Sequence, residues 1–318
     1  MDYVRLGKSG LKVSRICLGM MTYGSPKWRP WVLDEEASRP FIKRAVEAGI
    51  NFFDTANTYS HGTSEEFLGQ ALKELGMKRE DVVIATKVFF NDGKLSKEAI
   101  FREAEGSLRR LRTDYIDLYQ IHRFDYDHPI EETMEALDEL VKSGKVRSIG
   151  ASAMYGYQFH NMQVLAEKKG YTRFSTMQNH YNLLYREDER ELIPVCRQYG
   201  VTLIPYSPLA AGHLCRPTWD GDSARSKTDK FARNKYDHAK EKDMEIVKVV
   251  DRIAKAHGVS MTQIALAWLL AKGANPIVGS TKPHHYDDAV KALDVVLADE
   301  EIKKLEEFYI PHKIVGAL

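Results

Sequence analysis

Residues 50–62 read INFFDTANTYSHG, a short apolar run that turns abruptly polar. Phe52 and Phe53 are typical of a buried strand, and the carboxylate of Asp54 follows them directly. The phenol of Tyr59 comes next, in a segment of small polar residues. A carboxylate at the end of a buried strand needs a partner, because a lone buried charge is costly. The stretch therefore predicts a strand that ends at a functional group.

The same pattern recurs along the chain: a short apolar or β-branched run, a polar loop, then a segment of helical period. It predicts eight strands, at residues 15–19, 52–56, 82–88, 116–122, 146–152, 174–180, 202–208 and 276–280. Segments of helical period lie between them, among them residues 35–47, 65–75, 98–111, 130–142 and 188–199. Strand and helix therefore alternate throughout.

The expected helices carry start and stop signals. Residues 63–66 (TSEE) and 260–263 (SMTQ) fit the capping box, in which a hydroxyl residue is followed three positions later by Glu or Gln. Glycine follows several helix ends, at positions 49, 76, 144 and 200. These signals support the alternation of strand and helix.

Eight strand and helix units in 318 residues match a (β/α)8 TIM barrel with its catalytic face at the carboxyl ends of the strands. We therefore expect one barrel domain over residues 1–318. A doubly wound sheet is the alternative fold. When such a sheet binds a dinucleotide, it normally carries a G-x-G-x-x-G turn after its first strand, and the sequence contains no such turn.

Polar or ionisable residues lie at the ends of most predicted strands. They are Asp54, Lys87, His122, Ser152, Gln178 and Tyr206. Taken singly, Asp54 is explained as a turn residue, Lys87 as a surface lysine and His122 as a core histidine. An acid, a phenol, a base and an imidazole around one barrel mouth are better explained as a catalytic set. Because Asp54 and Lys87 come from neighbouring strands, they can form a buried pair.

The charges nearly balance, since 46 lysines and arginines face 45 aspartates and glutamates. No overall field therefore favours nucleic acid or an anionic membrane surface. Cys17, Cys196 and Cys215 show no C-x-x-C spacing, which suits free thiols in a reducing compartment. The sequence lacks the apolar core of a signal peptide and any apolar run of the roughly 18 residues that span a bilayer. We expect a cytoplasmic protein.

Long segments of the sequence resemble the signature segments of the aldo-keto reductases. They are FDTANTYSHGTSEEFLGQAL, VVIATKV, DYIDLYQIH, GKVRSIGAS, MQNHYNLLYR and IPYSPLAAGHL. The resemblance runs in order from LGKSGLKVSRICLGMMTYG to PIVGSTKP, which covers nearly the whole chain. Within the family, GASAMYGYQF and HYNLLYREDERELIP are similar to a branch of bacterial and fungal reductases of uncertain physiological substrate.

The resemblance implies an NADP-dependent oxidoreductase that reduces an aldehyde or ketone to an alcohol by hydride transfer. It places a catalytic tetrad at Asp54, Tyr59, Lys87 and His122. Tyr59 would be the general acid, although a free phenol with a pKa of about 10 is a weak acid at neutral pH. Lys87 is expected to lower that pKa, and Asp54 to hold Lys87 charged and oriented. His122 is expected to donate a hydrogen bond to the substrate oxygen.

The implied cofactor is NADPH, bound across the barrel mouth without a Rossmann domain. The resemblance assigns Ser152 and Gln178 to the carboxamide and Tyr206 to the face of the nicotinamide ring. The other cofactor positions that it implies are Gly19, Ser207, Leu209, Gly212, Gly279, Ser280, Thr281, Lys282 and His285. The last five lie after the eighth strand, where amides, hydroxyls and a cation suit a 2′-phosphate and favour NADP over NAD.

Three positions depart from the commoner family pattern. His285 stands where Arg or Gln is usual, Ala289 where Asn is usual, and Ala153 where Asn commonly follows the strand serine. We expect these departures to affect cofactor affinity and the preference for NADP rather than the chemistry.

Two loops are candidates for the walls of the site. Residues 25–33 (SPKWRPWVL) contain Trp28 and Trp31, and we expect Trp31, with Tyr23, to contact substrate, while loop packing is the plain alternative. Residues 216–242 are too long and polar for a plain connection. They are either a lid over the cofactor phosphates or a solvated loop. Their candidate phosphate ligands are Arg216, Arg225, Lys227, Lys230, Arg233 and Lys235.

Two other functions are compatible with a barrel. One is a cofactor-binding regulatory subunit, against which the intact tetrad argues. The other is a metal-dependent hydrolase that uses His122, Asp125 and His128, although their spacing matches no standard ligand set. We therefore expect no metal, a small-molecule carbonyl substrate, and a monomer or weak homo-oligomer.

Overall fold

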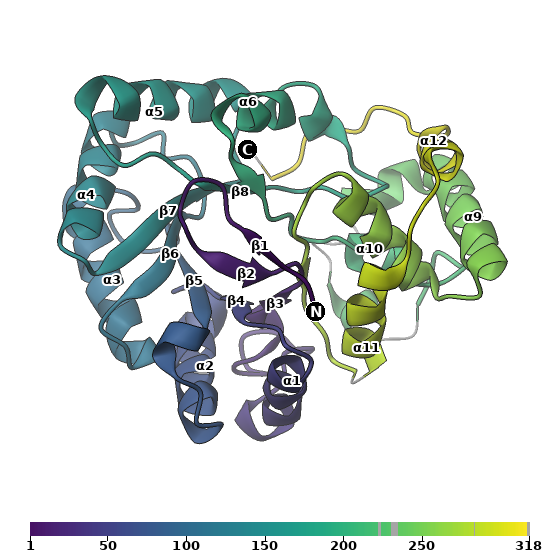
Figure 1. Ribbon diagram of the computed structural model, residues 1–318, viewed down its shortest axis with the longest axis horizontal. Coiled ribbons are helices and arrows are strands. Elements are labelled where there is room, and N and C mark those ends of the chain that lie inside the picture. The colour runs from purple at the N-terminus through teal and green to yellow at the C-terminus, as the bar shows by residue number, and fades with distance from the viewer. Residues whose placement is uncertain (222–223, 230–234, 283, 317–318) are drawn as a thin grey trace.

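The computed structural model describes residues 1–221, 224–229, 235–282 and 284–316 (Figure 1). Within these ranges the main sheet has eight parallel strands: β3 (Cys17–Gly19), β4 (Phe52–Asp54), β5 (Val83–Val88), β6 (Ile116–Ile121), β7 (Val146–Ser152), β8 (Thr176–Gln178), β9 (Thr202–Leu203) and β10 (Ile277–Val278). They pair in the order β10-β3-β4-β5-β6-β7-β8-β9. Each strand predicted from the sequence is present.

Two backbone hydrogen bonds join the first and last strands of this order. Asn275 N donates to Leu203 O at 2.9 Å, and Ile277 N donates to Pro205 O at 3.0 Å. β10 therefore lies against β9 and its continuation on one side and against β3 on the other. Because the two ends of the sheet meet, the sheet is a closed barrel. The predicted (β/α)8 fold is confirmed.

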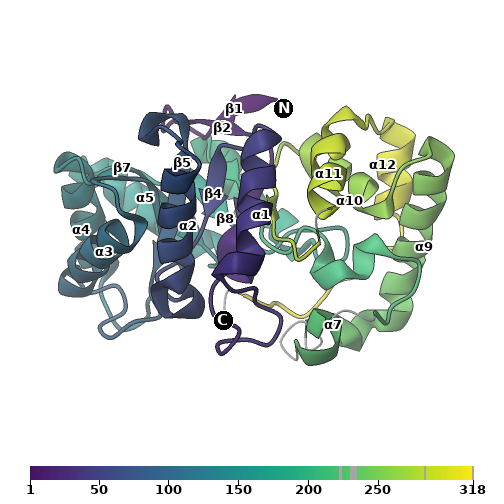
Figure 2. The same ribbon diagram turned by 90° about the horizontal axis from the view of Figure 1, so that it is seen from below.

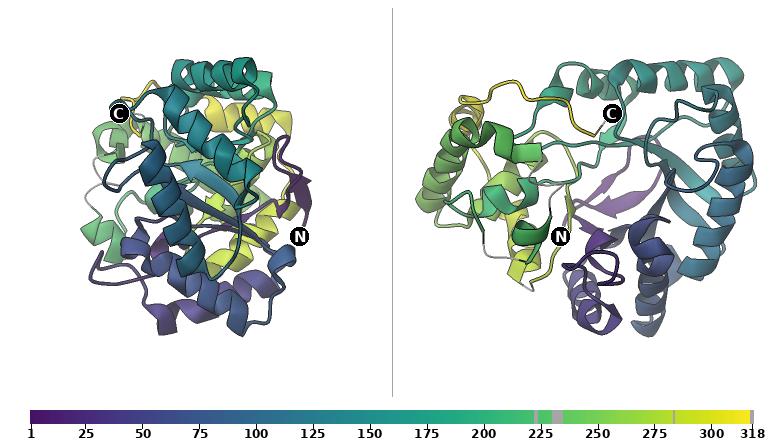
Figure 3. Two further views of the ribbon diagram at one scale, coloured as in Figure 1. Left: turned by 90° about the vertical axis from the view of Figure 1, so that its left-hand side faces the viewer. Right: turned by 180° about the vertical axis from the view of Figure 1, so that it is seen from behind.

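Helices surround the strands on the outside of the barrel (Figure 3). They are α1 (Glu35–Glu47), α2 (Thr63–Glu74), α3 (Lys97–Leu111), α4 (Ile130–Lys142), α5 (Gly156–Lys169), α6 (Leu192–Tyr199), α7 (Ala224–Thr228), α9 (Lys240–His257), α10 (Met261–Ala271), α11 (His284–Lys291) and α12 (Asp299–Glu306). Among the helices of the described ranges, none combines the length and the apolar character needed to cross a membrane.

One of the two predicted capping boxes is wrong. α2 begins at Thr63, and its N-cap is Gly62, which has a left-handed φ of 94° and makes no side-chain cap. Thr63 is therefore already helical and cannot cap the helix. The second capping box is confirmed, since Ser260 and Gln263 each accept from the backbone N–H of the other.

α6 starts later than the helical period predicts. The segment 188–199 enters through a 3-10 turn, η4 (Glu187–Glu189), and the α-helix begins at Leu192. Pro194 is the third residue of α6, in its first turn, where a proline fits. A start at position 188 would place Pro194 in the helix interior, which α1 tolerates at Pro40, so Pro194 favours the later start without requiring it.

A two-stranded hairpin, β1 (Tyr3–Arg5) and β2 (Lys12–Ser14), covers the amino-terminal end of the barrel. Gly7 N donates to Thr202 Oγ1, at the start of β9, at 2.7 Å. The apolar cluster under the hairpin comprises Leu6, Val13, Cys17, Phe52, Val83, Ala85, Leu118, Ile204 and Ile277. Burial of each large side chain there stabilises the fold by roughly 1.5–3 kcal/mol. Figure 2 shows this hairpin at one end of the barrel and α7 at the other, where the carboxyl ends of the strands lie.

Candidate active site

Lys87 lies at the centre of the polar groups in the barrel mouth. Its side chain is fully buried. Its ammonium donates to Asp54 Oδ1 at 2.6 Å, to the carbonyl oxygen of Thr55 at 2.6 Å and to the phenol oxygen of Tyr59 at 3.2 Å. An ammonium has three N–H donors, and these three acceptors use all of them. The structure therefore brings Asp54, Lys87 and Tyr59 together.

The second carboxylate oxygen of Asp54 is held by two amides. Gln120 Nε2 donates to Asp54 Oδ2 at 3.0 Å, and Gln178 Nε2 donates to it at 2.8 Å. Gln120, in β6, is not among the residues predicted from the sequence. A signal for it exists, because Gln120 lies two positions before His122 and residues two apart on a strand share a face. Asp54 therefore accepts from donors on β5, β6 and β8.

Charge and burial act in opposite directions on Lys87 and Tyr59. Burial favours a lower pKa for the ammonium of Lys87, but attraction to Asp54 and Tyr59 and hydrogen bonds to both together outweigh it, and the pKa is raised. Burial raises the pKa of the Tyr59 phenol, and the charge of Lys87 offsets only part of that increase. The lowering effect predicted for Lys87 is present, yet the net shift is upward because phenolate is poorly solvated here. Tyr59 therefore carries its proton at neutral pH.

His122 follows the end of β6 and joins this group. Its ring packs against that of Tyr59 with centroids 5.8 Å apart and planes at 80°. Burial first, and then the charges of Lys87 and Arg123, hold the pKa of the imidazole well below its usual range. His122 is therefore neutral at physiological pH. Within the described ranges its buried Nδ1 has no hydrogen-bond partner, so the ring retains hydrogen-bonding capacity.

The turn after Tyr59 has an unusual backbone. Ser60 and His61 have φ values of 50° and 56°, and Gly62 follows at 94°. A left-handed conformation costs a residue with a Cβ roughly 1–3 kcal/mol, so surrounding contacts must stabilise this turn. Ser60 Oγ accepts from Ser25 N at 3.0 Å. Arg110 packs on Gly62 so closely that a Cβ there would lie 2.6 Å from its Cδ.

The predicted nicotinamide residues lie at the ends of neighbouring strands. Ser152 Oγ donates to the carbonyl oxygen of Gln178 at 2.9 Å. The amide nitrogen of Gln178 donates to Asp54 and, at 3.3 Å, to Gln120 Oε1. The ring of Tyr206 stacks on His180 with centroids 5.3 Å apart and planes at 9°. In the described part of the chain the buried hydroxyl of Tyr206 has no hydrogen-bond partner.

The predicted pyrophosphate turn follows β9. Ser207, Ala210, Ala211 and Gly212 have positive φ values of 54°, 47°, 55° and 94°. Leu209 lies within this turn and accepts from Gly212 N at 2.8 Å. Left-handed residues turn the chain sharply, and backbone N–H groups at such a turn can bind an anion. A cavity of about 300 Å³ adjoins the turn at Ala211, and its other lining residues include Arg216 and Arg225.

The predicted 2′-phosphate residues form the turn between β10 and α11. Ser280 Oγ accepts from Lys282 N at 3.1 Å and donates to Lys282 O at 2.7 Å, which shapes the turn. Thr281 and Lys282 are exposed, and His285 N donates to Lys282 O at 3.1 Å. Gly279 packs against Thr22, with a Cβ there placed 2.9 Å from Thr22 Oγ1.

Two of the predicted ligand contacts lie inside the protein. Gly19 pairs with Asp54, and a Cβ on it would lie 2.8 Å from Ile277 Cγ2, so it permits close packing of β3 and β10. Tyr23 is fully buried, and its hydroxyl donates to Ser280 O at 2.8 Å and contacts the hydroxyl of Tyr286. These two contacts occupy the hydroxyl of Tyr23, which supports the turn at Ser280.

The two tryptophans of the loop after β3 have different surroundings. Trp28 lies beside Tyr59, with ring centroids 6.3 Å apart. Trp31 is 5% exposed and lies between two guanidinium groups, with Arg29 at 5.7 Å and Arg225 at 4.5 Å from its ring centroid. Trp28 is therefore the tryptophan nearer to the tetrad.

The predicted lid segment reaches the loop after β3. Arg225, in α7, lies over Trp31 and forms an ion pair with Asp229 at 3.1 Å. Lys235 is buried, and its ammonium lies 4.9 Å from the ring centroid of Tyr206. Lys230 and Arg233 lie outside the described residues. The described part of the segment therefore lies at the mouth, beside predicted cofactor and substrate residues.

The metal-site alternative lacks structural support. Asp125 accepts from Leu95 N at 2.9 Å, from Asp127 N at 2.9 Å and from His128 Nδ1 at 2.9 Å, so it organises its own loop. Within the described ranges, no group of three His, Cys, Asp or Glu side chains could hold a metal ion.

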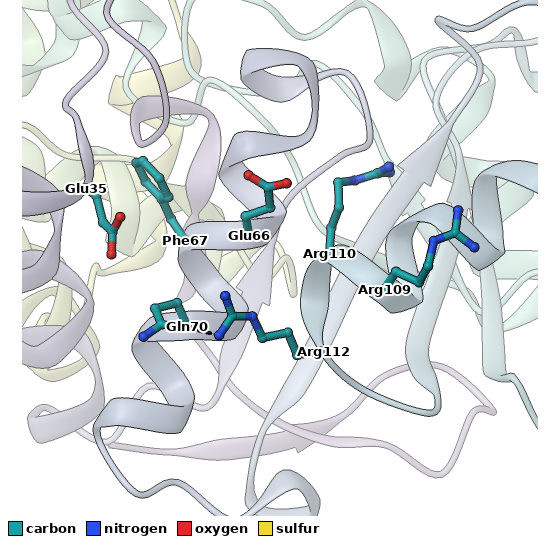
Figure 4. A pocket seen from close by; sticks show the side chains of 7 residues that line it. All are labelled: Glu35, Glu66, Phe67, Gln70, Arg109, Arg110 and Arg112. Atoms are coloured by element: carbon teal, nitrogen blue, oxygen red, sulfur yellow. Dashed lines mark hydrogen bonds between the residues drawn. The ribbon is translucent and has the colours of Figure 1, made fainter.

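A separate pocket of about 520 Å³ lies on the outside of the barrel (Figure 4). Its lining residues are Glu35, Glu66, Phe67, Gln70, Arg109, Arg110 and Arg112. Arg112 donates to Gln70, and Arg110 forms an ion pair with the buried Glu65 at 2.6 Å. None of the tetrad residues lines this pocket, which marks it as distinct from the site in the mouth.

Comparison with known proteins decides the family. The family model described as "Aldo/keto reductase family" matches residues 15–310. The chain belongs to this family. It is 44% identical to versiconal hemiacetal acetate reductase of Aspergillus parasiticus, over 99% of this chain and 98% of that protein. It is 43% identical to an aldo-keto reductase of Alternaria alternata, over 96% and 91%, and 42% identical to one of Metarhizium robertsii, over 99% and 93%.

Family membership makes this aldo/keto reductase an oxidoreductase that acts on carbonyl compounds with a nicotinamide cofactor. No cofactor is part of the structure, but the mouth fits one. The left-handed turn after β9 lies beside a cavity, and the buried hydroxyl of Tyr206 and Nδ1 of His122 have no partner within the described ranges.

The buried pair predicts strong coupling between Asp54 and Lys87. Asp54→Asn leaves a buried cation without its counter-ion and should lower the free energy of unfolding by about 3–5 kcal/mol, as should Lys87→Met. The double variant should lose clearly less stability than the sum of the two single losses, because each single variant leaves the other charge buried without a partner. Urea unfolding measures all three. The exposed pair Glu245 and Lys248 is the control and should show coupling near zero. Additive losses at Asp54 and Lys87 would contradict the buried pair.

Proposed function

We propose that this aldo/keto reductase uses NADPH to reduce an aldehyde or ketone to an alcohol, with Tyr59 as general acid. The observation that carries the proposal is the ammonium of Lys87, which donates to both Asp54 and the phenol oxygen of Tyr59. Because Lys87 donates to the phenol oxygen, the hydroxyl proton of Tyr59 remains available for a substrate oxygen.

The four residues have distinct roles in reduction. Bound NADPH supplies the hydride. Tyr59 gives its proton to the substrate oxygen as negative charge develops there, and the ammonium of Lys87 stabilises the phenolate that remains. Asp54 holds that ammonium in place through its ion pair with Lys87. In the reverse reaction the phenolate of Tyr59 takes the proton back.

His122 orients the substrate oxygen. The neutral imidazole can donate one hydrogen bond without adding charge to the site. Phe90 packs edge-on against His122 with centroids 4.9 Å apart, and Trp28 lies beside Tyr59. These two rings present apolar surface beside the donor pair, and a bound substrate would complete the exclusion of water that strengthens both donors toward a developing alkoxide.

The residues after the strands would hold the cofactor. Ser152, Gln178 and Tyr206 would contact the nicotinamide, where Gln178 Oε1 remains an acceptor because its amide nitrogen binds Asp54. Positions 207–212 would receive the pyrophosphate. The turn from Gly279 to Lys282, with His285, would receive the 2′-phosphate, and its exposed cation supports NADP over NAD.

The remaining features of the proposal follow from composition and fold. We propose one domain over residues 1–318, a cytoplasmic location and a monomer or weak homo-oligomer, with a small-molecule carbonyl compound as substrate. No metal is required for the residue roles described above. No particular contact in the structure favours a regulatory subunit over an enzyme.

Tyr59→Phe tests the assignment of the acid. The change removes only the hydroxyl, so the pair of Asp54 and Lys87 and the binding of NADPH should persist. A positioned general acid contributes about a hundredfold to ten-thousandfold, so kcat for aldehyde reduction should fall by at least a hundredfold. Oxidation of NADPH followed by absorbance gives kcat, and nicotinamide fluorescence gives the Kd.

Tyr3→Phe is the matched control, because the hydroxyl of Tyr3 donates to Gly49 O at the opposite end of the barrel. It should leave kcat unchanged. A folded, NADPH-binding Tyr59→Phe protein that reduced a good aldehyde at the wild-type rate would exclude Tyr59 as the acid.

Lys282→Met tests the cofactor preference. Wild-type protein should bind NADPH more tightly than NADH, and the variant should lose about 1.5–3 kcal/mol of that difference, the value of one charge-assisted phosphate contact. Fluorescence titration with both cofactors measures it, and Lys248→Met, on the distant helix α9, serves as control. Equal affinity of the wild type for NADPH and NADH would remove the 2′-phosphate assignment.

A further inference from the structure

Arg123 places a guanidinium beside the catalytic groups. It directly follows His122, and its Nη1 donates to the carbonyl oxygen of His122 at 3.0 Å. The guanidinium carbon lies 5.7 Å from the ring centroid of Phe90. Phe90 is 51% exposed and packs against the imidazole of His122. Guanidinium, phenyl ring and imidazole therefore form one continuous wall of the mouth.

The charge of Arg123 affects the pKa values of several groups in the site. It acts to lower the pKa of Tyr59, although burial makes the net shift upward, and it adds to the effects of burial and Lys87 that lower the pKa of His122. Lys235 is a second cation in range, and its pKa is lowered to about 8 by burial first and then by repulsion from Arg123, while the charge of Asp229 opposes part of that decrease and that of Arg225 adds to it. Positive charge is therefore concentrated on this side of the mouth.

Among the described residues, none supplies a carboxylate counter-ion to Arg123. Across the described ranges Arg123 forms no salt bridge, and its side-chain hydrogen bond goes to a backbone carbonyl oxygen. The acids that follow it in the loop are engaged elsewhere, since Asp125 binds backbone amides and His128, and Asp127 binds Lys94. The charge of Asp54 is already matched by Lys87. A partly buried guanidinium beside a second cation favours binding of an external anion.

We propose that Arg123 binds a carboxylate on the substrate, and that the preferred substrates are carbonyl compounds that carry such a group; this rests on the function proposed above. The planar guanidinium matches a carboxylate in two-point geometry, and within the described ranges only Nη1 of Arg123 has a hydrogen-bond partner, which leaves its other N–H groups for a ligand. Phe90 would pack against the part of the substrate that joins its carboxylate to its carbonyl carbon. Arg123 is thus a specificity residue, and Tyr59 and His122 remain the groups that meet the carbonyl oxygen.

The test uses two aldehydes that share a benzaldehyde ring, 4-carboxybenzaldehyde and methyl 4-formylbenzoate. The first carries a negatively charged carboxylate, and the second carries a neutral ester in its place. Wild-type protein should show the higher kcat/KM for the acid. Arg123→Met should lower the ratio of acid to ester by on the order of 10- to 100-fold, mostly through KM for the acid, the loss expected for one charge-assisted bond. The ratio cancels any change in Tyr59 or His122 that affects both aldehydes. Arg123→Lys should recover part of the loss, because the charge returns without the planar fork.

Arg109→Met is the matched control, since Arg109 is an exposed arginine of the outer pocket in Figure 4 and its loss changes net charge equally. It should leave the ratio unchanged. An unchanged ratio in Arg123→Met would overturn the proposal. Weaker NADPH binding in Arg123→Met with an unchanged ratio would assign Arg123 to the cofactor instead, and would also overturn it.

The test separates this inference from the proposed function. If wild-type protein reduces neither aldehyde, the proposed function fails. Calorimetric titration of the NADP-loaded protein with 4-carboxybenzaldehyde then still decides the role of Arg123. The proposal requires that Arg123→Met weaken this binding by at least tenfold while Arg109→Met does not, and equal affinity in the two variants would overturn it.

Discussion

A buried ammonium with every donor satisfied is the constraint on which the mouth of this barrel depends. Lys87 is fully buried, and removing such a charge from water is expensive unless it is paired and hydrogen-bonded. Its three donors meet a carboxylate, a carbonyl and a phenol, and the carboxylate is held in turn by Gln120 and Gln178. The polar ends of β4, β5, β6 and β8 therefore depend on one another, and removal of either charge leaves the other buried and unpaired.

The same burial determines which groups of the site carry a proton at neutral pH. Desolvation raises the pKa of Tyr59 and lowers that of His122, so at neutral pH the phenol holds its proton and the imidazole is uncharged. Both groups can then donate to one oxygen without repelling each other. Lys87 stabilises the phenolate only after the proton has left, which places its effect in the transition state rather than in the resting protein. The strained turn at Ser60 holds the phenol where this can occur.

Much of this arrangement is predictable from the sequence, because apolar runs that end in an ionisable residue mark strand ends in a barrel. Asp54, Lys87 and His122 are found in this way, Tyr59 is found in the polar segment that follows Asp54, and the family resemblance joins the four as a tetrad. Gln120 is missed because its signal, a position on the same strand face as His122, depends on His122 being recognised first. The burial of Tyr23 and the net direction of the Tyr59 pKa depend on packing between distant segments, which no local pattern reports. Thr63 is mistaken for a cap because Gly62 supplies the turn.

The most direct test of the central claim is the ionisation of Tyr59 itself. Protein labelled with ¹³C at the tyrosine ζ carbon, with the signal assigned by its loss in Tyr59→Phe, reports the phenol over a pH titration. The account predicts a neutral phenol at pH 7, a pKa above the ordinary value of about 10, and a further increase in Lys87→Met because the opposing cation is removed. A phenolate signal at neutral pH, or a pKa that does not respond to loss of Lys87, would contradict it.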